Sequence, residues 1–313
     1  MSRHTLATYS GLHIEVNPFY AALGAEVSGC DVRMLDDGSF NTIYRAMLDH
    51  LVIRIRSQVL DELEQTKFMA RFGQLENPPV KAASQKDRDP RYPHISVISN
   101  VKENGIAIGA LGDGEAFWHT DTSYAEAPPS FTSLHSLEIP PSGGDTSFTN
   151  MYAALDKLPC DVRDRIEGKT LKHDAVHNAG GELHAGASEP EDVISCPGRN
   201  HPVIRTHPET GHQALYLGRR LNGYINGLSI DDSEALLNTL WSHATRTEFT
   251  WTQQWEVGDI IIWDNRCVMH RRDAFDPNSR RVMHKSVCKG SVPRYDSTAL
   301  RSVHSRSGAV LGR

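Results

Sequence analysis

The chain has 313 residues, of which 39% are hydrophobic and 23% are charged, and its formal net charge is -6. These proportions are ordinary for a globular protein. The length allows one large domain or two small ones, and because β-rich folds of this length are often single, we expect one domain spanning residues 1–313. A negative chain without runs of lysine or arginine lacks the basic face that phosphate backbones require, so we expect no nucleic acid partner.

The N-terminus and the cysteines indicate the cellular compartment. Met1 to Tyr9 contains no apolar core of signal-peptide length, and no stretch approaches the roughly 20 apolar residues of a membrane span. The five cysteines are scattered without a Cys-x-x-Cys pair, a pattern typical of reduced thiols rather than of a zinc site or a disulfide framework. We therefore expect a cytoplasmic protein with no membrane partner. We also expect a homo-oligomer, either a dimer or a tetramer.

Hydrophobic periodicity predicts a small number of helices. Apolar residues at helical spacing predict a helix over Phe40 to Leu51 with Ser39 as its N-cap, and a second helix over Asp61 to Arg71. Asp231 to His243 is the clearest amphipathic helix, with Ser229 or Asp231 as its N-cap. Two short helices are predicted over Tyr152 to Leu158 and Cys160 to Gly168.

The predicted strands outnumber the helices. They include, in chain order, Leu23 to Val32, Leu51 to Arg56, His94 to Val101, Phe131 to Ile139, Asp145 to Asn150, Leu171 to Val176, Val203 to Thr206, Ala214 to Leu217 and Gly258 to Asn265. Many short strands with few helices are typical of an antiparallel double sheet. The sequence therefore predicts a mainly β protein with peripheral helices around a jelly-roll core, the double-stranded β-helix of cupin-like proteins.

Two segments lack this regularity. Residues 76–117 combine Pro78-Pro79, a polar run and a glycine-rich stretch around one strand. Residues 177–200 hold glycine, proline and glutamate with few large apolar side chains. Loops of this kind often select the substrate or close over a site. We expect both segments to act as lid loops.

His119 and Asp121 are a candidate pair of metal ligands. In a strand, residues i and i+2 project to the same side about 6.5 Å apart along the chain, so both can reach one ion. The pairing by itself is weak, because the sequence also contains His13/Glu15 and His207/Glu209. Only the pair at His119 has aromatic neighbours, Phe117, Trp118 and Tyr124, together with suitable motifs downstream.

A third ligand is expected from a segment far downstream. Gly258 to Asn265 is typical of a turn that leads into a buried strand, and we expect this strand to deliver His270. Two histidines and one carboxylate on one face, with other positions left open, form the facial triad of non-haem Fe(II) oxygenases. His119, Asp121 and His270 are therefore the candidate metal ligands and the candidate catalytic centre.

The same motifs resemble those of a known family. The sequence contains, in the family's order and spacing, His119-x-Asp121, Pro128-Pro129, Gly143-Gly144-Asp145-Thr146, Gly258-Asp259 with Trp263-Asp264-Asn265 and His270, and Arg281. This arrangement resembles the taurine dioxygenase and 2,4-dichlorophenoxyacetate dioxygenase family over residues 12–293. The resemblance implies a jelly-roll enzyme that uses Fe(II), O2 and 2-oxoglutarate as a cosubstrate.

The resemblance also assigns residues to the cosubstrate. Arg281 matches the arginine with which the family binds the distal carboxylate of 2-oxoglutarate, and a guanidinium fork suits such a bidentate contact. Thr146 matches the family's hydroxyl donor to the same carboxylate. Trp263 and Asn265 are expected to brace the iron ligands or to line the pocket.

Lys285 and Lys81 are the candidate substrate-binding cations. Many relatives carry arginine where Lys285 stands, so this chain keeps the charge and loses the fork. Substrate, 2-oxoglutarate and solvent all remain open as partners of Lys285. Taurine-specific relatives have a histidine about where Pro78 stands, so its absence weakens the taurine reading. Lys81, a few residues later, is either a replacement cation or a solvated side chain.

The resemblance implies hydroxylation of a small organic anion, with succinate and CO2 as co-products. Where the hydroxylated carbon bears oxygen or sulfur, cleavage of the C–O or C–S bond follows. Related halogenases lack the carboxylate ligand, so Asp121 favours hydroxylation over halogenation. Two alternatives stay open. One is a natural-product tailoring oxygenase that desaturates or cyclises its substrate, and the other is a jelly-roll metal hydrolase, which would have no use for Arg281 and Thr146.

Overall fold

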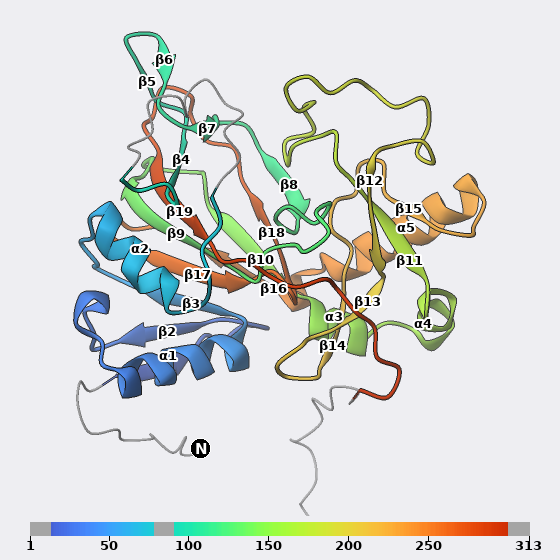
Figure 1. The fold of residues 1–313 in the computed structure, drawn as a ribbon, viewed down its shortest axis with the longest axis horizontal. Coiled ribbons are helices and arrows are strands. Elements are labelled where there is room, and N and C mark those ends of the chain that lie inside the picture. Colours follow the sequence, from blue (N-terminus) through green and yellow to red (C-terminus); the bar gives the residue numbers. More distant parts are fainter. Residues whose placement is uncertain (1–13, 78–90, 300–313) are drawn as a thin grey trace, which may run out of the picture.

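Two β-sheets form the body of the molecule in the computed structural model, which describes residues 14–77 and 91–299 (Figure 1). The larger sheet has eight strands and the smaller sheet has four. In spatial order the larger sheet contains β1 (Glu15–Pro18), β2 (Ala25–Ser28), β3 (Val52–Ile55), β17 (Ile260–Asp264), β9 (Phe131–Glu138), β19 (Val282–Val287), β4 (Ser96–Ser99) and β7 (Ala110–Leu111). The smaller sheet contains β16 (Thr250–Gln253), β10 (Thr146–Asn150), β18 (Val268–Arg272) and β8 (Ala116–His119).

The strands along the chain alternate between these two sheets. β8 and β10 belong to the smaller sheet and β9 to the larger one, and β16, β17, β18 and β19 alternate in the same way. Neighbouring strands run antiparallel in both sheets, except that β2 is parallel to β3 and β4 is parallel to β7. Antiparallel strands that alternate between two facing sheets form a jelly roll. The predicted fold class is confirmed.

β17 shows how the apolar core is divided. Ile261 and Trp263 belong to the core between the two sheets, whereas Ile260 and Ile262 belong to a second core on the outer face of the larger sheet. This alternation is the period of two that a strand imposes. Full burial of one such side chain stabilises the fold by about 1.5–3 kcal/mol, so a register shift by one residue would be costly.

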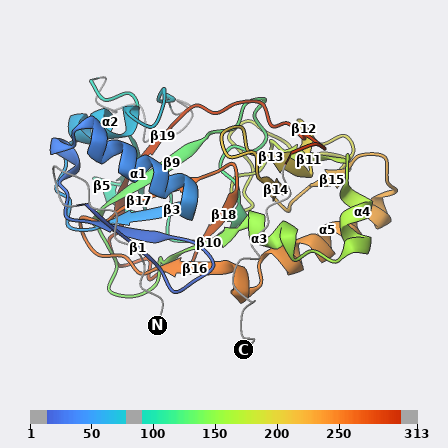
Figure 2. The same ribbon diagram turned by 90° about the horizontal axis from the view of Figure 1, so that it is seen from below.

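The outer core is covered by α1 (Asp37–His50) and α2 (Glu62–Ala70), which contact β17, β3 and β19 (Figure 2). The prediction that Ser39 caps the first helix was wrong. The side chain of Asp36 accepts a hydrogen bond from the backbone N–H of Ser39, so the helix begins two residues before Ser39. Asp61 and Glu64 form a capping box at α2.

Residues 151–249 form a lobe inserted between β10 and β16 (Figures 1 and 2). Ser229 caps its longest helix, α5 (Ile230–Ala244), as one of the two predicted N-caps. The lobe also contains α3 (Met151–Asp156), α4 (Cys160–Ile166), a sheet of β12 (Gly198–Pro202), β11 (Thr170–Asp174) and β15 (Tyr224–Ile225), and the pair β13 (Ile204–Thr206) and β14 (Gln213–Leu215). The remaining elements are the hairpin β5 (Lys102–Glu103) and β6 (Ile106–Ala107) and the 3-10 helices η1 (Val32–Met34) and η3 (Thr247–Phe249).

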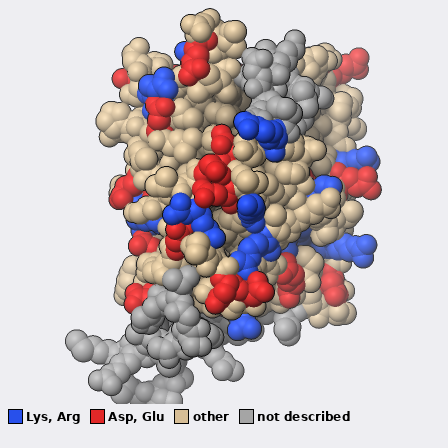
Figure 3. Space-filling view, turned by 60° about the vertical axis from the view of Figure 1, so that its left-hand side comes forward, with Lys and Arg blue, Asp and Glu red and all other residues tan. Residues whose placement is uncertain are grey.

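The surface in Figure 3 carries charges of both signs. Lysine and arginine side chains are interspersed with aspartate and glutamate over the described part of this face. The expected absence of a nucleic acid partner is not tested by this view and stays a prediction. Among the residues that the structure describes, no helix combines the length and the apolar character that crossing a membrane demands.

Candidate metal centre

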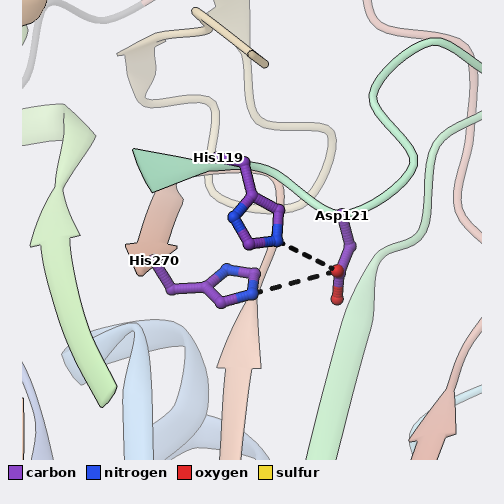
Figure 4. A group of neighbouring side chains, drawn as sticks. All are labelled: His119, Asp121 and His270. Atoms are coloured by element: carbon purple, nitrogen blue, oxygen red, sulfur yellow. Dashed lines mark ion pairs between the residues drawn. The ribbon is translucent and has the colours of Figure 1, made fainter. Parts of the chain in front are cut away.

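The candidate metal centre is built on the smaller sheet. His119 ends β8 and His270 lies in β18, and the two residues are opposite each other in the antiparallel register. Asp121 lies two residues beyond the end of β8, in the following turn. Figure 4 shows both imidazoles directed at the Asp121 carboxylate, with His119 Nε2 3.7 Å and His270 Nε2 3.8 Å from Asp121 Oδ1.

Two details of the predicted arrangement were wrong. Asp121 reaches the site through a turn rather than by the alternation of a strand, because β8 ends at His119. His270 is carried by β18, whereas the predicted strand over Gly258 to Asn265 is β17 in the opposite sheet. The turn after Asp264 takes the chain from the larger sheet to the smaller one, so β17 and β18 are separate strands in opposite sheets rather than one continuous strand.

The three side chains have the geometry of a metal site. Their ligand atoms lie within 4.8 Å of one another, all three residues are buried, and among the described residues they are the one group of histidine, cysteine or acidic side chains that meets this condition. Two histidines and one carboxylate this close together are the donor set of a non-haem Fe(II) facial triad.

The hydrogen bonds and charges around the site favour metal binding. His119 Nδ1 donates to Phe117 O at 2.7 Å, which leaves a lone pair on Nε2. Burial lowers the pKa of His270 well below its ordinary value, and the nearby His119 lowers it further. Burial alone would raise the pKa of Asp121, but Lys285 and the two histidines outweigh this and hold that pKa well below its usual range. Neutral imidazoles and an ionised carboxylate are the forms that bind divalent metals.

A chain of hydrogen bonds supports Asp121 from the larger sheet. Trp263 Nε1 donates to Asn265 Oδ1 at 3.0 Å, and Asn265 Nδ2 donates to Thr132 Oγ1 at 2.8 Å. The Thr132 hydroxyl then donates to Asp121 Oδ2 at 2.9 Å. Lys285 Nζ lies 2.9 Å from the same oxygen. With Oδ2 engaged in this way, Oδ1 is the oxygen that faces the two imidazoles.

A small cavity of about 50 Å³ adjoins the triad and contains Arg281. Arg281 is 1% exposed, and its Nε and Nη2 atoms have no hydrogen-bond partner among the described residues. Burial, aided by the neighbouring Arg272, lowers the pKa of Arg281 to about 9. A buried cation without a counter-charge is costly, so the arrangement fits an anionic ligand.

Thr146 lines the same cavity and is oriented by Trp255. The Trp255 indole donates from Nε1 to Thr146 Oγ1 at 3.1 Å, which leaves the hydroxyl proton of Thr146 available for another acceptor. Arg281 and Thr146 thus offer unused donors to the same cavity that the triad lines. This donor set fits the distal carboxylate of 2-oxoglutarate.

Sequence reasoning did not single out Arg272, which lies in the same cavity. Arg272 is two residues beyond His270 in β18 and opposite Thr146 in the register with β10. Residues i and i+2 share one face of a strand, so this position could have been found from the sequence once His270 was chosen. Its Nη2 donates to Leu111 O at 2.9 Å and also to Gly114 O, which holds the segment that precedes β8 against the cavity.

The other predicted residues are distributed as follows. Trp263 lines the small cavity and its ring centroid lies 4.6 Å from that of His270, and its predicted role in bracing the ligands or lining the pocket stays a prediction. Lys285 lines the same cavity with its ammonium on Asp121, and its contact with substrate or cosubstrate stays a prediction. Lys81 and Pro78 lie outside the described residues.

A second cavity, of about 530 Å³, also reaches His119. The inserted lobe supplies most of its wall, including His177, Ala179 and Val193 from the predicted lid loop 177–200. The action of either predicted loop as a lid stays a prediction.

An iron oxygenase that consumes 2-oxoglutarate needs a facial triad and a separate carboxylate-binding arginine, whereas a jelly-roll hydrolase needs only the metal ligands. The fold and the site together define the first class. Comparison with protein families agrees with this assignment. The chain belongs to the taurine catabolism dioxygenase TauD, TfdA family, whose family model matches residues 15–287.

Individual relatives support the same class. The chain is 32% identical over 285 residues to the alpha-ketoglutarate-dependent 2,4-dichlorophenoxyacetate dioxygenase of Cupriavidus pinatubonensis, covering 88% of this chain and 98% of the relative. It is 33% identical over 292 residues to the pentalenolactone F synthase of Streptomyces arenae, covering 88% and 95% of the two chains. The solved structure of AAD-2 in complex with Mn(II) and N-oxalylglycine matches with a TM-score of 0.73 at 27% identity, covering 90% and 98%. The chain is an Fe(II)- and 2-oxoglutarate-dependent dioxygenase.

Proposed function

We propose that His119, Asp121 and His270 bind Fe(II), that Arg281 and Thr146 bind the distal carboxylate of 2-oxoglutarate, and that the enzyme hydroxylates a small organic anion. The observation that carries this proposal is the buried Arg281, whose unpartnered donors adjoin the triad within one cavity. A metal hydrolase has no use for such an arginine.

Some residues of the chain bind the cosubstrate, and others orient the metal ligands. Bound iron supplies O2 activation coupled to the oxidative decarboxylation of 2-oxoglutarate to succinate and CO2, with transfer of one oxygen atom to a substrate C–H bond. Arg281 and Thr146 fix the remote end of the cosubstrate, so its keto acid end is directed toward the triad. Thr132 and Lys285 hold Asp121 Oδ2, so Oδ1 is presented to the metal. Trp263 packs against His270 and limits its rotation.

The names of the relatives support an organic anion as substrate. The relative from Cupriavidus pinatubonensis acts on 2,4-dichlorophenoxyacetate, a carboxylate with an aryl ether. Hydroxylation of a carbon that bears an ether oxygen gives a hemiacetal that collapses with C–O cleavage. The pentalenolactone F synthase relative favours a second candidate, a tailoring oxygenase of natural-product synthesis that desaturates or cyclises its substrate. The single-domain organisation, homo-oligomeric state and cytoplasmic location stay predictions.

The test is anaerobic addition of Fe(II) and then 2-oxoglutarate to the metal-free protein. We expect the weak visible charge-transfer band of 2-oxoglutarate chelated to Fe(II). His270→Ala should abolish the band, and the matched control His94→Ala should retain it, because His94 lies outside the triad and its Nδ1 hydrogen-bonds the carbonyl of Glu76. A folded wild-type protein that binds iron but forms no band would contradict the proposal and favour the hydrolase.

A further inference from the structure

Arg219 is a cation of the inserted lobe that lies beside the metal centre. It is in the segment between β14 and β15 and forms an isolated antiparallel bridge with His119. Its guanidinium carbon lies 5.0 Å from the ring centroid of Tyr124, and its Nη1 donates to the backbone carbonyl of His177. Its Nε is buried without a hydrogen-bond partner among the described residues. These contacts hold the guanidinium in place, and Arg219 is one of the residues that line the 530 Å³ cavity.

The other acidic and basic residues that line this cavity each have a partner, either within the cavity or just outside it. Asp174 contacts His177 at 2.7 Å, Arg220 contacts Glu234 at 2.5 Å, and Glu115 contacts Arg271 at 3.5 Å. Among the described residues, Arg219 has no carboxylate within ion-pair distance. Arg219 is thus a cation of this cavity without an ion-pair partner among the described residues, although the more distant carboxylates of Asp121 and Asp174 act to raise its pKa against the effect of burial.

The rest of the cavity wall is largely apolar. Phe117 and Trp118 of β8, Leu221 of the lobe and Trp241 of α5 are the large apolar side chains that line it. A volume of about 530 Å³ lies within the range of roughly 300–1,000 Å³ that small-molecule sites occupy. One unmatched cation in an apolar cavity is suited to a ligand with an apolar body and one anionic group.

We propose that Arg219 binds the anionic group of the substrate and that the substrate is an amphipathic organic anion with an aryl or alkyl body. This inference rests on the proposed function and names the substrate class for the same site. The backbone bridge between Arg219 and His119 puts the two residues side by side, so the proposed anion-binding residue is a neighbour of a metal ligand. Lys285, the cation favoured by the sequence, lines the small cavity with Arg281, whereas Arg219 lines the large one. The two cations thus serve different cavities.

The experiment measures direct binding rather than turnover. Protein loaded with Mn(II) and 2-oxoglutarate is titrated by calorimetry with 2,4-dichlorophenoxyacetate and with its neutral amide, and in parallel with octyl sulfate and 1-octanol. The wild type should bind at least one anion ten or more times more tightly than its neutral counterpart. Arg219→Met should lose this preference, and Arg219→Lys should retain part of it, because lysine keeps the charge without the fork.

Arg220→Met is the matched control, because Arg220 lines the same cavity but is already paired with Glu234. It should keep the preference for the anion. If Arg219→Met does not fold, Arg219→Gln and Arg219→Lys provide the comparison between neutral and charged side chains. A preference unchanged in Arg219→Met or Arg219→Gln, or no preference in the wild type for either anion, would overturn the assignment of Arg219.

The same protein samples are examined with Fe(II) in place of Mn(II). A wild-type charge-transfer band together with an unchanged anion preference in Arg219→Met overturns only the role of Arg219. A folded wild type that binds iron but shows no band overturns the proposed function. The two failures are therefore distinguishable.

Discussion

Two buried arginines of this fold, Arg266 and Arg281, have opposite surroundings. Arg266 Nη2 lies 2.7 Å from Asp264, its Nε donates to Asp264 at 2.8 Å, and its Nη1 donates to Glu209. Arg281 lines a cavity next to the triad, and its Nε and Nη2 atoms have no hydrogen-bond partner in the part of the chain that the structure describes. Although burial lowers the pKa of both, the two carboxylates raise that of Arg266 above its usual value, whereas the pKa of Arg281 falls to about 9. The charge of Arg266 is balanced by carboxylates of the protein, whereas that of Arg281 calls for an anionic ligand.

The surroundings of Arg266 explain why it is a structural residue. His207 contacts Asp264 at 3.0 Å, and the hydroxyl of Tyr44 donates to Glu209 at 2.7 Å. These contacts connect α1 and the inserted lobe to the turn between β17 and β18. The network therefore holds the turn that brings His270 into the smaller sheet.

The largest expected effect is that of Arg266→Met on stability. The variant leaves Asp264 buried without its main counter-charge, so we expect the free energy of unfolding to fall by about 3–5 kcal/mol, measured by denaturant titration. The folded fraction should bind 2-oxoglutarate with unchanged affinity. Arg280→Met is the control, since Arg280 forms an exposed, solvent-screened pair with Glu138 and its loss should change the stability little.

The same variant has a pH signature. Burial alone would raise the pKa of Asp264, but Arg266 and His207 outweigh it, so the folded pKa lies below the unfolded value of about 3.9. A depressed carboxylate pKa stabilises the fold above the unfolded pKa, and this contribution is lost as the pH falls toward the folded pKa. The difference in stability between wild type and Arg266→Met should therefore shrink below about pH 4. A constant difference across this range would show that Asp264 is not the group affected.

The second expected effect is that of Arg281→Met on cosubstrate affinity. Loss of charged hydrogen bonds worth about 2–3 kcal/mol should weaken 2-oxoglutarate binding by roughly 30–150-fold, measured by anaerobic titration of the charge-transfer band. Stability should be unchanged or higher, because the variant removes a buried charge that has no ion-pair partner among the described residues. The 2-oxoglutarate affinity of Arg281→Lys should lie between those of the wild type and Arg281→Met, since lysine keeps the charge and loses the bidentate guanidinium fork. Equal losses of stability in Arg266→Met and Arg281→Met would remove the distinction between the two arginines.

The parts of this site that could be predicted from sequence are those encoded locally. His119-x-Asp121 and the buried strand before His270 are visible as spacing and apolar runs, and the many short strands indicate the jelly roll. Arg272 became apparent only through its register with Thr146. The proximity of Arg219 to His119 is visible only in the folded structure, because the two residues are about a hundred positions apart in the sequence and meet through the inserted lobe. Contacts of this range depend on the closure of the whole fold, so a local pattern does not reveal them.

The smallest expected effect concerns Thr132, which links Asn265 to Asp121 and has no contact of its own with the metal position. Thr132→Val keeps the shape of the side chain but removes the donor to Asp121 Oδ2 and leaves Asn265 Nδ2 without its acceptor. Removing such a supporting group typically costs 10–100-fold in metal affinity, and we expect about tenfold here because Lys285 still contacts Oδ2.

Thr132→Ser keeps the hydroxyl and should bind Fe(II) within a few-fold of the wild type, so the pair of variants separates the effect of the hydrogen bond from that of packing. Competition with a coloured chelator under anaerobic conditions measures both affinities. Equal weakening in the two variants would mean that the methyl group, and not the hydroxyl, supports Asp121, and the chain of hydrogen bonds from Trp263 would then have no part in metal binding.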